Sequence, residues 1–468
     1  MRLGTTILLS TALGVEAFGS YTFAITVATM ISVFSPLGLD IGAVFFGAQY
    51  HNQDRAKQRA MIINGYIVTG ISGVVFAGGL WWGADLFGDP AIIRRIAPVI
   101  LFLNPLLFSV GVIRSIKDMR GNAIVYQITP SILLLCMGAA TYFFSLSLSV
   151  VLLMYTIAMG ISAGLGIFWV GKATDVLFDR SLPNRYSLFE QLQYSIPQSL
   201  AAMAFRLTIW TDIIMLGFLS TERDLGLYRI AAALAMMGAL PVSALSTIFN
   251  PIIAKKVSEK AWAELNATLK TVTRWLMSLS LPVLCAMFLL PDFLLQFFGE
   301  EYIESQTSLL ILIGGQFVWV SCAMAMRLIP MSGRSTLNLI NGICAALLNI
   351  LLNWYLIPKY GTIGAAISTS ITLGLWSLWR LLEIWHLMNC FPFTKSSFLF
   401  FGLACGIALV GYPFLIPLSL WIRFPLVFII SCLFLYFTIQ IGTEDADVEI
   451  MDILKSKIPS FFRRRRSS

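Results

Sequence analysis

The sequence predicts an all-α protein that crosses a membrane about 14 times. Three observations lead to this fold class: an apolar composition, apolar runs of roughly 20 residues, and basic residues concentrated in alternate loops. Hydrophobic residues make up 58% of the 468 residues, charged residues make up only 12%, and the mean hydropathy is +0.82. These values exclude a soluble globular protein. Because about 20 apolar residues cross the hydrocarbon layer as a helix, each run indicates a transmembrane span.

The predicted spans follow one another with mostly short loops. The first, residues 3–13, is too short to cross unaided, so most of the first helix is expected to be missing, as if the start codon were placed too late. The second, residues 21–48, is interrupted at Pro36 and Gly38 and carries Asp40. The remaining spans lie at about residues 61–83, 96–113, 123–144, 149–171, 195–219, 226–249, 275–298, 306–330, 336–357, 362–386, 398–420 and 424–441.

The distribution of Lys and Arg predicts the orientation of these spans. Of the 32 basic residues, 22 fall in alternate loops and in the C-terminal tail, and five fall in the loops between them. Because cytoplasmic loops carry the excess of Lys and Arg, both termini are expected in the cytoplasm of a multi-pass inner-membrane protein. The net charge of +8 therefore reflects topology and not nucleic-acid binding. The seven Cys and two His form no cluster, so neither a disulfide framework nor a metal site is indicated.

The chain also contains an internal repeat. A G-x-Y motif begins at Gly19, after the first span, and again at Gly226, after the seventh, 207 residues later. A second match relates Gly121 to Gly333, with a similar offset of 212. Six spans separate the copies, and an even number predicts two parallel six-helix lobes, as in transporters whose halves are related by an axis along the membrane normal. The predicted division is an N-lobe at 1–180, a C-lobe at 181–390, two extra helices at 391–442 and a cytoplasmic charged tail at 443–468.

One predicted helix, residues 195–219, carries charges inside its apolar run. Arg206 lies near its centre, and Asp212 follows six residues later. A charge at mid-bilayer costs at least ~2.5–3.5 kcal/mol, so it usually faces a polar cavity or a partner. At six residues apart the two side chains point about 120° away from each other, so they cannot simply neutralise one another on one face. Three interpretations stay open: a buried structural pair, an Arg206 that lines a polar pathway, or an Arg206 that snorkels toward the interface.

A family resemblance emerges at the end of the second copy, in LLNILLNWYLIPKYGTIGAAISTSI (residues 347–371). This segment combines paired Asn residues, a Leu-Ile-Pro-x-Tyr-Gly turn and a Gly-Ala-Ala helix start. It resembles the polysaccharide-biosynthesis branch of the multidrug/oligosaccharidyl-lipid/polysaccharide exporter superfamily, the O-antigen-type flippases. The segments LGVEAFGSYTFAI, WTDIIMLGFLSTERDLGLYRIA, FNPIIAKK and LPDFLLQFFGEEY are similar to other landmarks of that branch, in the same order. The resemblance runs from about residue 12 to residue 386 and departs from the pattern at the N-terminus.

The resemblance implies a transporter and not an enzyme. The implied fold has two six-helix lobes around a central cavity, with the last two helices outside. The implied activity is the flipping of an undecaprenyl-diphosphate-linked oligosaccharide across the cytoplasmic membrane, by alternating access, for O-antigen, capsule or exopolysaccharide synthesis. Expected partners are the lipid-linked oligosaccharide and membrane lipids, with the polysaccharide polymerase and chain-length machinery as further candidates. No cofactor is expected, and a coupling ion, H⁺ or Na⁺, is left open.

Six residues are candidates for the cavity. Arg206 would hold the diphosphate, because Arg offers bidentate donors and stays charged in a low dielectric. Arg327 and Arg380 are the second choices, and Gln198 is a candidate for contact with sugars. The alternative function is a cation-coupled multidrug antiporter of the same fold, whose titrating carboxylate would be Asp40 or Asp212. A membrane glycosyltransferase or polymerase is disfavoured because the external loops are very short. Asn349 and Asn353 are expected to form hydrogen bonds between helices.

Overall fold

The chain is helical throughout the part that the structure describes. The computed structural model describes residues 2–51, 53–177, 179, 188–406, 414 and 418–441, and no strand occurs among them. The predicted all-α class is therefore confirmed. The chain divides into two compact units, which are described separately below. The first comprises Met1–Ile230, Gln296–Glu304 and Gly342–Ala365, and the second comprises Ala231–Leu295, Ser305–Asn341 and Ala366–Ser468.

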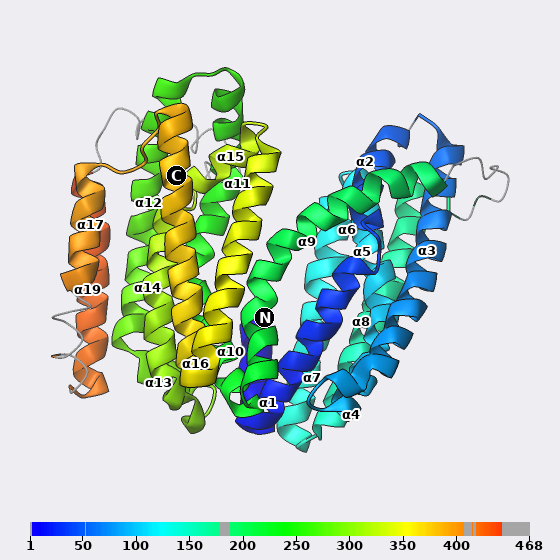
Figure 1. Ribbon diagram of the computed structural model, residues 1–468, viewed down its shortest axis with the longest axis horizontal. Coiled ribbons are helices and arrows are strands. Elements are labelled where there is room, and N and C mark those ends of the chain that lie inside the picture. Colours follow the sequence, from blue (N-terminus) through cyan, green and yellow to red (C-terminus); the bar gives the residue numbers. More distant parts are fainter. Residues whose placement is uncertain are drawn as a thin grey trace, which may run out of the picture. The chain divides into compact units, whose positions relative to one another are not determined.

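The first unit is a bundle in which α5 packs against α2, α3 and α8 (Figure 1). Its central helix is apolar, and most of its side chains are buried, including Leu106, Phe108 and Ile113. Its helices are α1 (Arg2–Phe34), α2 (Leu39–Tyr50), α3 (Arg55–Trp82), α4 (Pro90–Ile96), α5 (Val99–Ser115), α6 (Met119–Asn122), α7 (Thr129–Phe144), α8 (Leu148–Thr174), α9 (Leu188–Leu219) and most of α10 (Glu222–Ala235).

The breaks near the N-terminus fall at glycine and proline. Within α1 the backbone leaves helical geometry at Gly14, with φ 75° and ψ 172°. A turn at residues 35–38 then separates α1 from α2, and Gly38 caps α2 with φ 74°. Glycine adopts such positive φ values without the steric cost that a side chain adds. The predicted interruption of the second span at Pro36 and Gly38 is confirmed.

The second unit has its core between α11, α12, α14 and α15. Phe249, Leu269 and Leu276 are fully buried there, together with Leu328. The helices of this unit are α11 (Leu240–Ser258), α12 (Trp262–Leu289), α13 (Pro291–Gln296), α14 (Gln306–Cys322), α15 (Leu328–Met331), parts of α16 (Ser335–Met388), α17 (Lys395–Gly406) and α19 (Leu420–Ile441).

One long helix corresponds to two predicted spans. The backbone of α16 leaves helical geometry at Gly361, with φ 53° and ψ −126°. This glycine lies between the spans predicted at residues 336–357 and 362–386, so that boundary is confirmed. Both α1 and α16 therefore contain two helical segments joined at a glycine.

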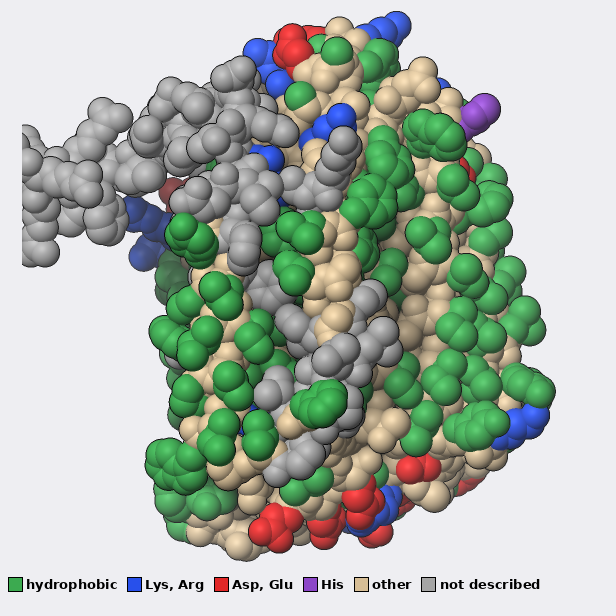
Figure 2. All heavy atoms as spheres, turned by 90° about the vertical axis from the view of Figure 1, so that its left-hand side faces the viewer, with side chains coloured by type: hydrophobic (Ala, Val, Ile, Leu, Met, Phe, Trp, Pro, Cys, Tyr) green, Lys and Arg blue, Asp and Glu red, His purple; other side chains and the backbone are tan. Residues whose placement is uncertain are grey.

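The apolar lengths of the helices suit a membrane. Among the described residues, nine helices are long and apolar enough to cross one, and α1 and α16 each count once among them despite their breaks. On the face shown in Figure 2, hydrophobic side chains cover the middle, and charged side chains gather toward the two ends. This confirms a multi-pass membrane protein. The charged tail predicted at 443–468 lies outside the described residues, and the division into N-lobe, C-lobe and two extra helices stays a prediction.

Candidate functional site

A buried carboxylate lies where three helices of the first unit meet. Asp212 of α9 is only 7% exposed. Its Oδ2 accepts a hydrogen bond from the hydroxyl of Tyr228 on α10 at 2.8 Å, and its Oδ1 accepts one from Nδ2 of Asn353 on α16, also at 2.8 Å. Hydrogen bonds to an ionised acceptor are among the stronger ones. They therefore offset part of the cost of removing this carboxylate from water.

Asn353 extends this network along α16. Its Nδ2 also donates to Oδ1 of Asn349, one turn earlier, at 3.0 Å, and both residues are buried. The hydrogen bond between helices predicted for these asparagines is confirmed for Asn353. The Oδ1 of Asn353 has no hydrogen-bond partner within the described residues. We refer to Asp212, Tyr228, Asn349 and Asn353 as the Asp212 cluster.

The start of α10 sets the depth of Tyr228. The hydroxyl oxygen of Thr221 accepts a hydrogen bond from the backbone N–H of Asp224 at 3.2 Å, the pattern of a helix N-cap. Tyr228 then follows about 9 Å along the helix from its first residue. Its counterpart in the first copy of the repeat, Tyr21, is 9% exposed and meets Tyr155 edge-on, with ring centroids 6.4 Å apart.

Arg229 brings a positive charge beside the Asp212 cluster. It is partly buried and lies near the phenol groups of Tyr21 and Tyr228. In the part of the chain that the structure describes, Arg229 forms neither an ion pair nor a hydrogen bond. A cation at membrane depth costs at least ~2.5–3.5 kcal/mol by insertion scales unless something compensates it. Arg229 is therefore suited to bind a negatively charged ligand.

The two charges of this region offer different chemistry. The Asp212 carboxylate and the free Oδ1 of Asn353 are oxygen ligands of the kind that hard cations prefer, and a buried carboxylate can also take up a proton. No group of three His, Cys, Asp or Glu lies together in the described ranges, so a cation here would rely partly on neutral oxygens. The guanidinium of Arg229 matches the geometry of phosphate oxygens, to which it can donate two parallel hydrogen bonds.

Two predicted residues belong to α9 but cannot be placed further. The side chains of Arg206 and Gln198 lie outside the described residues, so their roles stay predictions. Sequence reasoning chose Arg206 and assigned no role to Arg229. The signal for Arg229 was nevertheless present, because it is a charge inside an apolar span, three residues after the Gly226 of the repeated motif.

Arg380 makes contacts of a structural kind in the second unit. It is 4% exposed, its Nη2 donates to the carbonyl oxygen of Met326 at 2.6 Å, and its guanidinium lies 5.7 Å from the Trp376 ring centre. Met326 belongs to a short 3₁₀ turn that interrupts the helix between α14 and α15. Carbonyl groups at such interruptions lose helical partners, and Arg380 supplies one. Its predicted role as a diphosphate ligand stays a prediction.

The last two predicted residues lie on other elements. Arg327 ends the same 3₁₀ turn and is partly exposed. Asp40 lies in the first turn of α2, in the first unit, where its main chain packs closely against Gly111 of α5. It too is partly exposed. Of the six candidates, the structure places Asp212 in the polar network described above.

The fold is that of the α-helical transporters of the exporter superfamily. One solved structure with this fold is the lipid II flippase MurJ in an inward closed conformation, with a TM-score of 0.75 and 14% identity, over 94% of this chain and 96% of MurJ. Another is the inward-facing conformation of a multidrug resistance MATE family transporter of the MOP superfamily. Its TM-score is 0.71 at 15% identity, over 83% of this chain and 94% of that one. At such identities the likeness shows the fold alone.

The chain belongs to the polysaccharide biosynthesis protein family, whose model matches residues 1–257. The MatE model matches residues 197–355. The predicted branch of the exporter superfamily is thereby confirmed.

Two curated relatives come from Haloferax volcanii. The probable low-salt glycan biosynthesis flippase Agl15 is 22% identical over 47% of this chain and 46% of its own length. The probable flippase AglR is 28% identical over 45% of this chain and 44% of its own length. The chain thus spans about half the length of the curated relatives it matches. These relatives are named as flippases and not as enzymes, in agreement with the prediction of a transporter.

Proposed function

We propose that the protein flips an undecaprenyl-diphosphate-linked oligosaccharide across the cytoplasmic membrane, by alternating access, for surface polysaccharide synthesis. The observation that carries the proposal is Arg229, a membrane-embedded cation without an ion-pair partner in the described chain, beside a buried polar cluster. Family membership supports it, as do the names of the two curated relatives.

The chemistry of such a substrate sets the demands on the site. Its diphosphate is the part that hydrocarbon excludes most strongly, while its lipid tail can stay in the bilayer. Arg229 would bind the diphosphate through two parallel hydrogen bonds, and Arg206 on α9 would supply a second cation. The phenol of Tyr21 and the amide of Gln198 would meet sugar hydroxyl groups.

The test of this proposal is flipping in reconstituted vesicles. A fluorescent oligosaccharide on a polyprenyl diphosphate serves as the substrate, and its loss from one leaflet is measured. Arg229→Ala should abolish flipping, and Arg229→Lys should keep part of it, because Lys retains the charge but not the bidentate geometry. The matched control is Arg94→Ala, which removes an exposed arginine paired with Asp85 and should leave flipping unchanged. An Arg229→Ala protein that inserts normally and flips at the full rate would contradict the proposal.

Arg206 can be judged in the same assay. If Arg206 holds the diphosphate, Arg206→Ala should lose flipping while its membrane abundance is unchanged. If it is instead the buried partner of Asp212, its removal leaves an unpaired charge costing roughly 3–5 kcal/mol. Abundance should then fall, and the double change Arg206→Ala with Asp212→Ala should restore it.

A cation-coupled multidrug antiporter is the second candidate function, because it needs a membrane-embedded carboxylate and Asp212 is a buried one. In either function Asp212 would bind the coupling ion, H⁺ or Na⁺. Asp212→Asn should then remove the dependence of transport on an imposed ion gradient. The two functions differ in their cargo: an antiporter would move a fluorescent cationic drug, whereas a flippase would move the lipid-linked glycan and leave the drug behind.

The proposal includes a location and further partners. The protein would lie in the inner membrane with both termini in the cytoplasm, as the distribution of Lys and Arg indicates. The polysaccharide polymerase and the chain-length machinery would act next, because an exported repeat unit must be polymerised at the outer face.

A further inference from the structure

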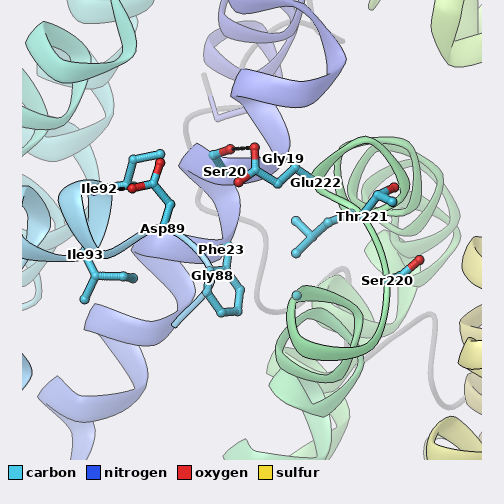
Figure 3. A pocket seen from close by; sticks show the side chains of 12 residues that line it. Gly19, Ser20, Phe23, Gly88, Asp89, Ile92, Ile93, Ser220, Thr221 and Glu222 are labelled. Carbon is cyan, nitrogen blue, oxygen red and sulfur yellow. Dashed lines mark hydrogen bonds between the residues drawn. The ribbon is translucent and has the colours of Figure 1, made fainter. Parts of the chain in front are cut away.

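A small pocket lies at one end of the first unit, where the end of α9 and the starts of α4 and α10 approach α1 (Figure 3). Its volume is about 220 Å³, below the about 300–1,000 Å³ of sites for drug-sized ligands. It therefore suits a ligand about the size of a single sugar ring. The loops at this end are those that the distribution of Lys and Arg assigns to the outer side of the membrane.

The polar groups of this pocket mainly accept hydrogen bonds. Its two carboxylates are Asp89, which caps α4, and Glu222, in the first turn of α10. Oδ1 of Asp89 accepts from the backbone N–H groups of Ala91 and Ile92, and Oε2 of Glu222 accepts from the hydroxyl of Ser20, which faces it in Figure 3. The second oxygen of each carboxylate forms no hydrogen bond with the described residues. Because the described lining holds no Lys, Arg or His, the pocket offers free acceptors and negative charge.

Glycines shape the pocket by letting the main chain come close. A β-carbon at Gly19 would lie 2.8 Å from the carbonyl carbon of Glu222 and 3.0 Å from the amide nitrogen of Gly226, so the backbones of α1 and α10 touch there. At Gly217, a β-carbon would overlap the ring of Phe23, so this glycine makes room for the aromatic side chain that lines the pocket. An aromatic surface beside a few fixed polar groups is the usual lining of a small-molecule site.

The pocket and the candidate diphosphate ligand lie on the same side of α10. Glu222 and Arg229 are seven residues apart, so their side chains leave the helix within about 20° of each other, about 10 Å apart along its axis. The acid stands at the end of the helix, and the arginine stands deeper. A ligand with an anionic part at Arg229 and a hydroxyl-rich part toward the outer end therefore matches the order of these two charges.

We propose that this pocket binds one sugar unit of the exported glycan and selects a sugar without an acid group. The inference rests on the proposed function and gives the glycan a site separate from that of its diphosphate. Sugar hydroxyl groups donate to the free oxygens of Asp89 and Glu222, and the apolar face of the ring packs against Phe23. A uronic acid brings a third negative charge that no cation in the pocket pairs, and an unpaired charge of this kind rejects a ligand.

A bare metal ion matches this pocket less well than a sugar. Hard cations such as Ca²⁺ take six to eight oxygen ligands at short distances. The described residues hold no group of three His, Cys, Asp or Glu, and the volume of about 220 Å³ far exceeds that of an ion. Both observations favour a ligand that is itself rich in hydrogen-bond donors.

Saturation-transfer NMR with free sugars tests the inference on the full-length protein in lipid nanodiscs. Glucose, galactose, N-acetylglucosamine and glucosamine are compared with glucuronic and galacturonic acid. At least one of the first four should bind, and the two acids should not. Glu222→Ala should raise the dissociation constant of the bound sugar about tenfold, because a hydrogen bond to a charged group is lost. The matched control is Glu190→Ala, which removes an exposed carboxylate of α9 outside the pocket and should change nothing. Binding of none of the first four sugars, or unchanged binding in Glu222→Ala, would overturn the inference.

A second variant tests the selection by charge. The double change Asp89→Asn with Glu222→Gln keeps the size of both side chains, and asparagine still caps a helix. The uronic acids should now bind about as well as the neutral sugar. If they remain excluded, the two carboxylates do not select the ligand and the inference fails.

These measurements separate the inference from the proposed function, because the free sugars carry no lipid and no transport is measured. A protein that binds free sugars in this way and flips no lipid-linked glycan would contradict the proposed function alone. A protein that flips the glycan while Glu222→Ala changes neither sugar binding nor flipping would contradict the pocket alone.

Discussion

Arg423 shows what an ion-paired arginine looks like in this protein. Its Nη1 and Nη2 donate to Oδ1 and Oδ2 of Asp292 at 2.9 and 2.7 Å, and the residue is 6% exposed. This bidentate pair ties the start of α19 to α13 within the second unit. Arg229 forms no such pair among the described residues, and this difference separates a structural arginine from a candidate ligand-binding one.

We expect that breaking the ion pair between Arg423 and Asp292 lowers the stability of the protein and leaves its transport specificity unchanged. Arg423→Ala leaves the carboxylate of Asp292 without its charged donor, which costs about 1.5–3 kcal/mol for a bond to a charged group. The melting temperature of the purified protein in detergent should fall. The double change with Asp292→Ala should recover part of the loss, because no unpaired charge remains. A melting temperature that does not change in Arg423→Ala would contradict the structural role.

At the scale of elements, glycines decide where long apolar helices break. Gly361 adopts φ 53° and ψ −126°, and a β-carbon there would lie 2.9 Å from a carboxylate oxygen of Asp224. Gly374, on the same helix, has helical geometry, and a β-carbon there would meet nothing within 4 Å. Within one long helix, Gly361 therefore has a backbone conformation and a close neighbour that disfavour a side chain, whereas Gly374 has neither.

Alanine substitutions at these two positions should change stability in opposite directions. Gly361→Ala adds strain at a positive φ and a clash with Asp224, which costs of order 1–3 kcal/mol for backbone strain of this kind. Gly374→Ala should instead stabilise the helix by roughly 0.5–1 kcal/mol. Thermal unfolding of both variants beside the wild type checks this, and a decrease of similar size at both positions would show that the break at Gly361 requires no glycine.

At the scale of the whole molecule, alternate loops of the first unit gather at opposite ends. Arg55 donates to the carbonyl oxygen of Asp175 at one end. At the other, the pocket brings residues 19–23 and 88–93 together with residues 217–225. Arg223 joins this second end to Glu301 by an ion pair of 3.3 Å. These are the two groups of loops that the distribution of Lys and Arg assigns to opposite sides of the membrane.

Thiol labelling in intact cells can test this topology. Gln53→Cys and Glu301→Cys both replace exposed residues. A membrane-impermeant reagent should label the cysteine at position 301 from outside, and it should reach the one at position 53 only after the cells are opened. Labelling of both positions from outside would overturn the orientation that places both termini in the cytoplasm.

The sequence by itself determined the class, the breaks near Pro36 and Gly361, and the repeat, because each depends on local or regularly spaced residues. The length of an apolar run determines a local helix, and glycine and proline break a helix at their own positions in the chain. Only part of the candidate site could be predicted from the sequence. Depth within a span singled out Arg206 and Asp212, and it could not rank Arg229 above them.

Only the tertiary structure decided which polar groups meet. Asp212 is joined to Tyr228, 16 residues away, and to Asn353, 141 residues away. Separations of this kind follow from how three helices pack and leave no periodic trace in the sequence. The same holds for Gly19 and Gly226: the sequence shows that they repeat, but only packing shows that their backbones touch. A buried charge acquires its role from the partners that packing brings to it, and Arg229 stands out because packing brings it none among the described residues.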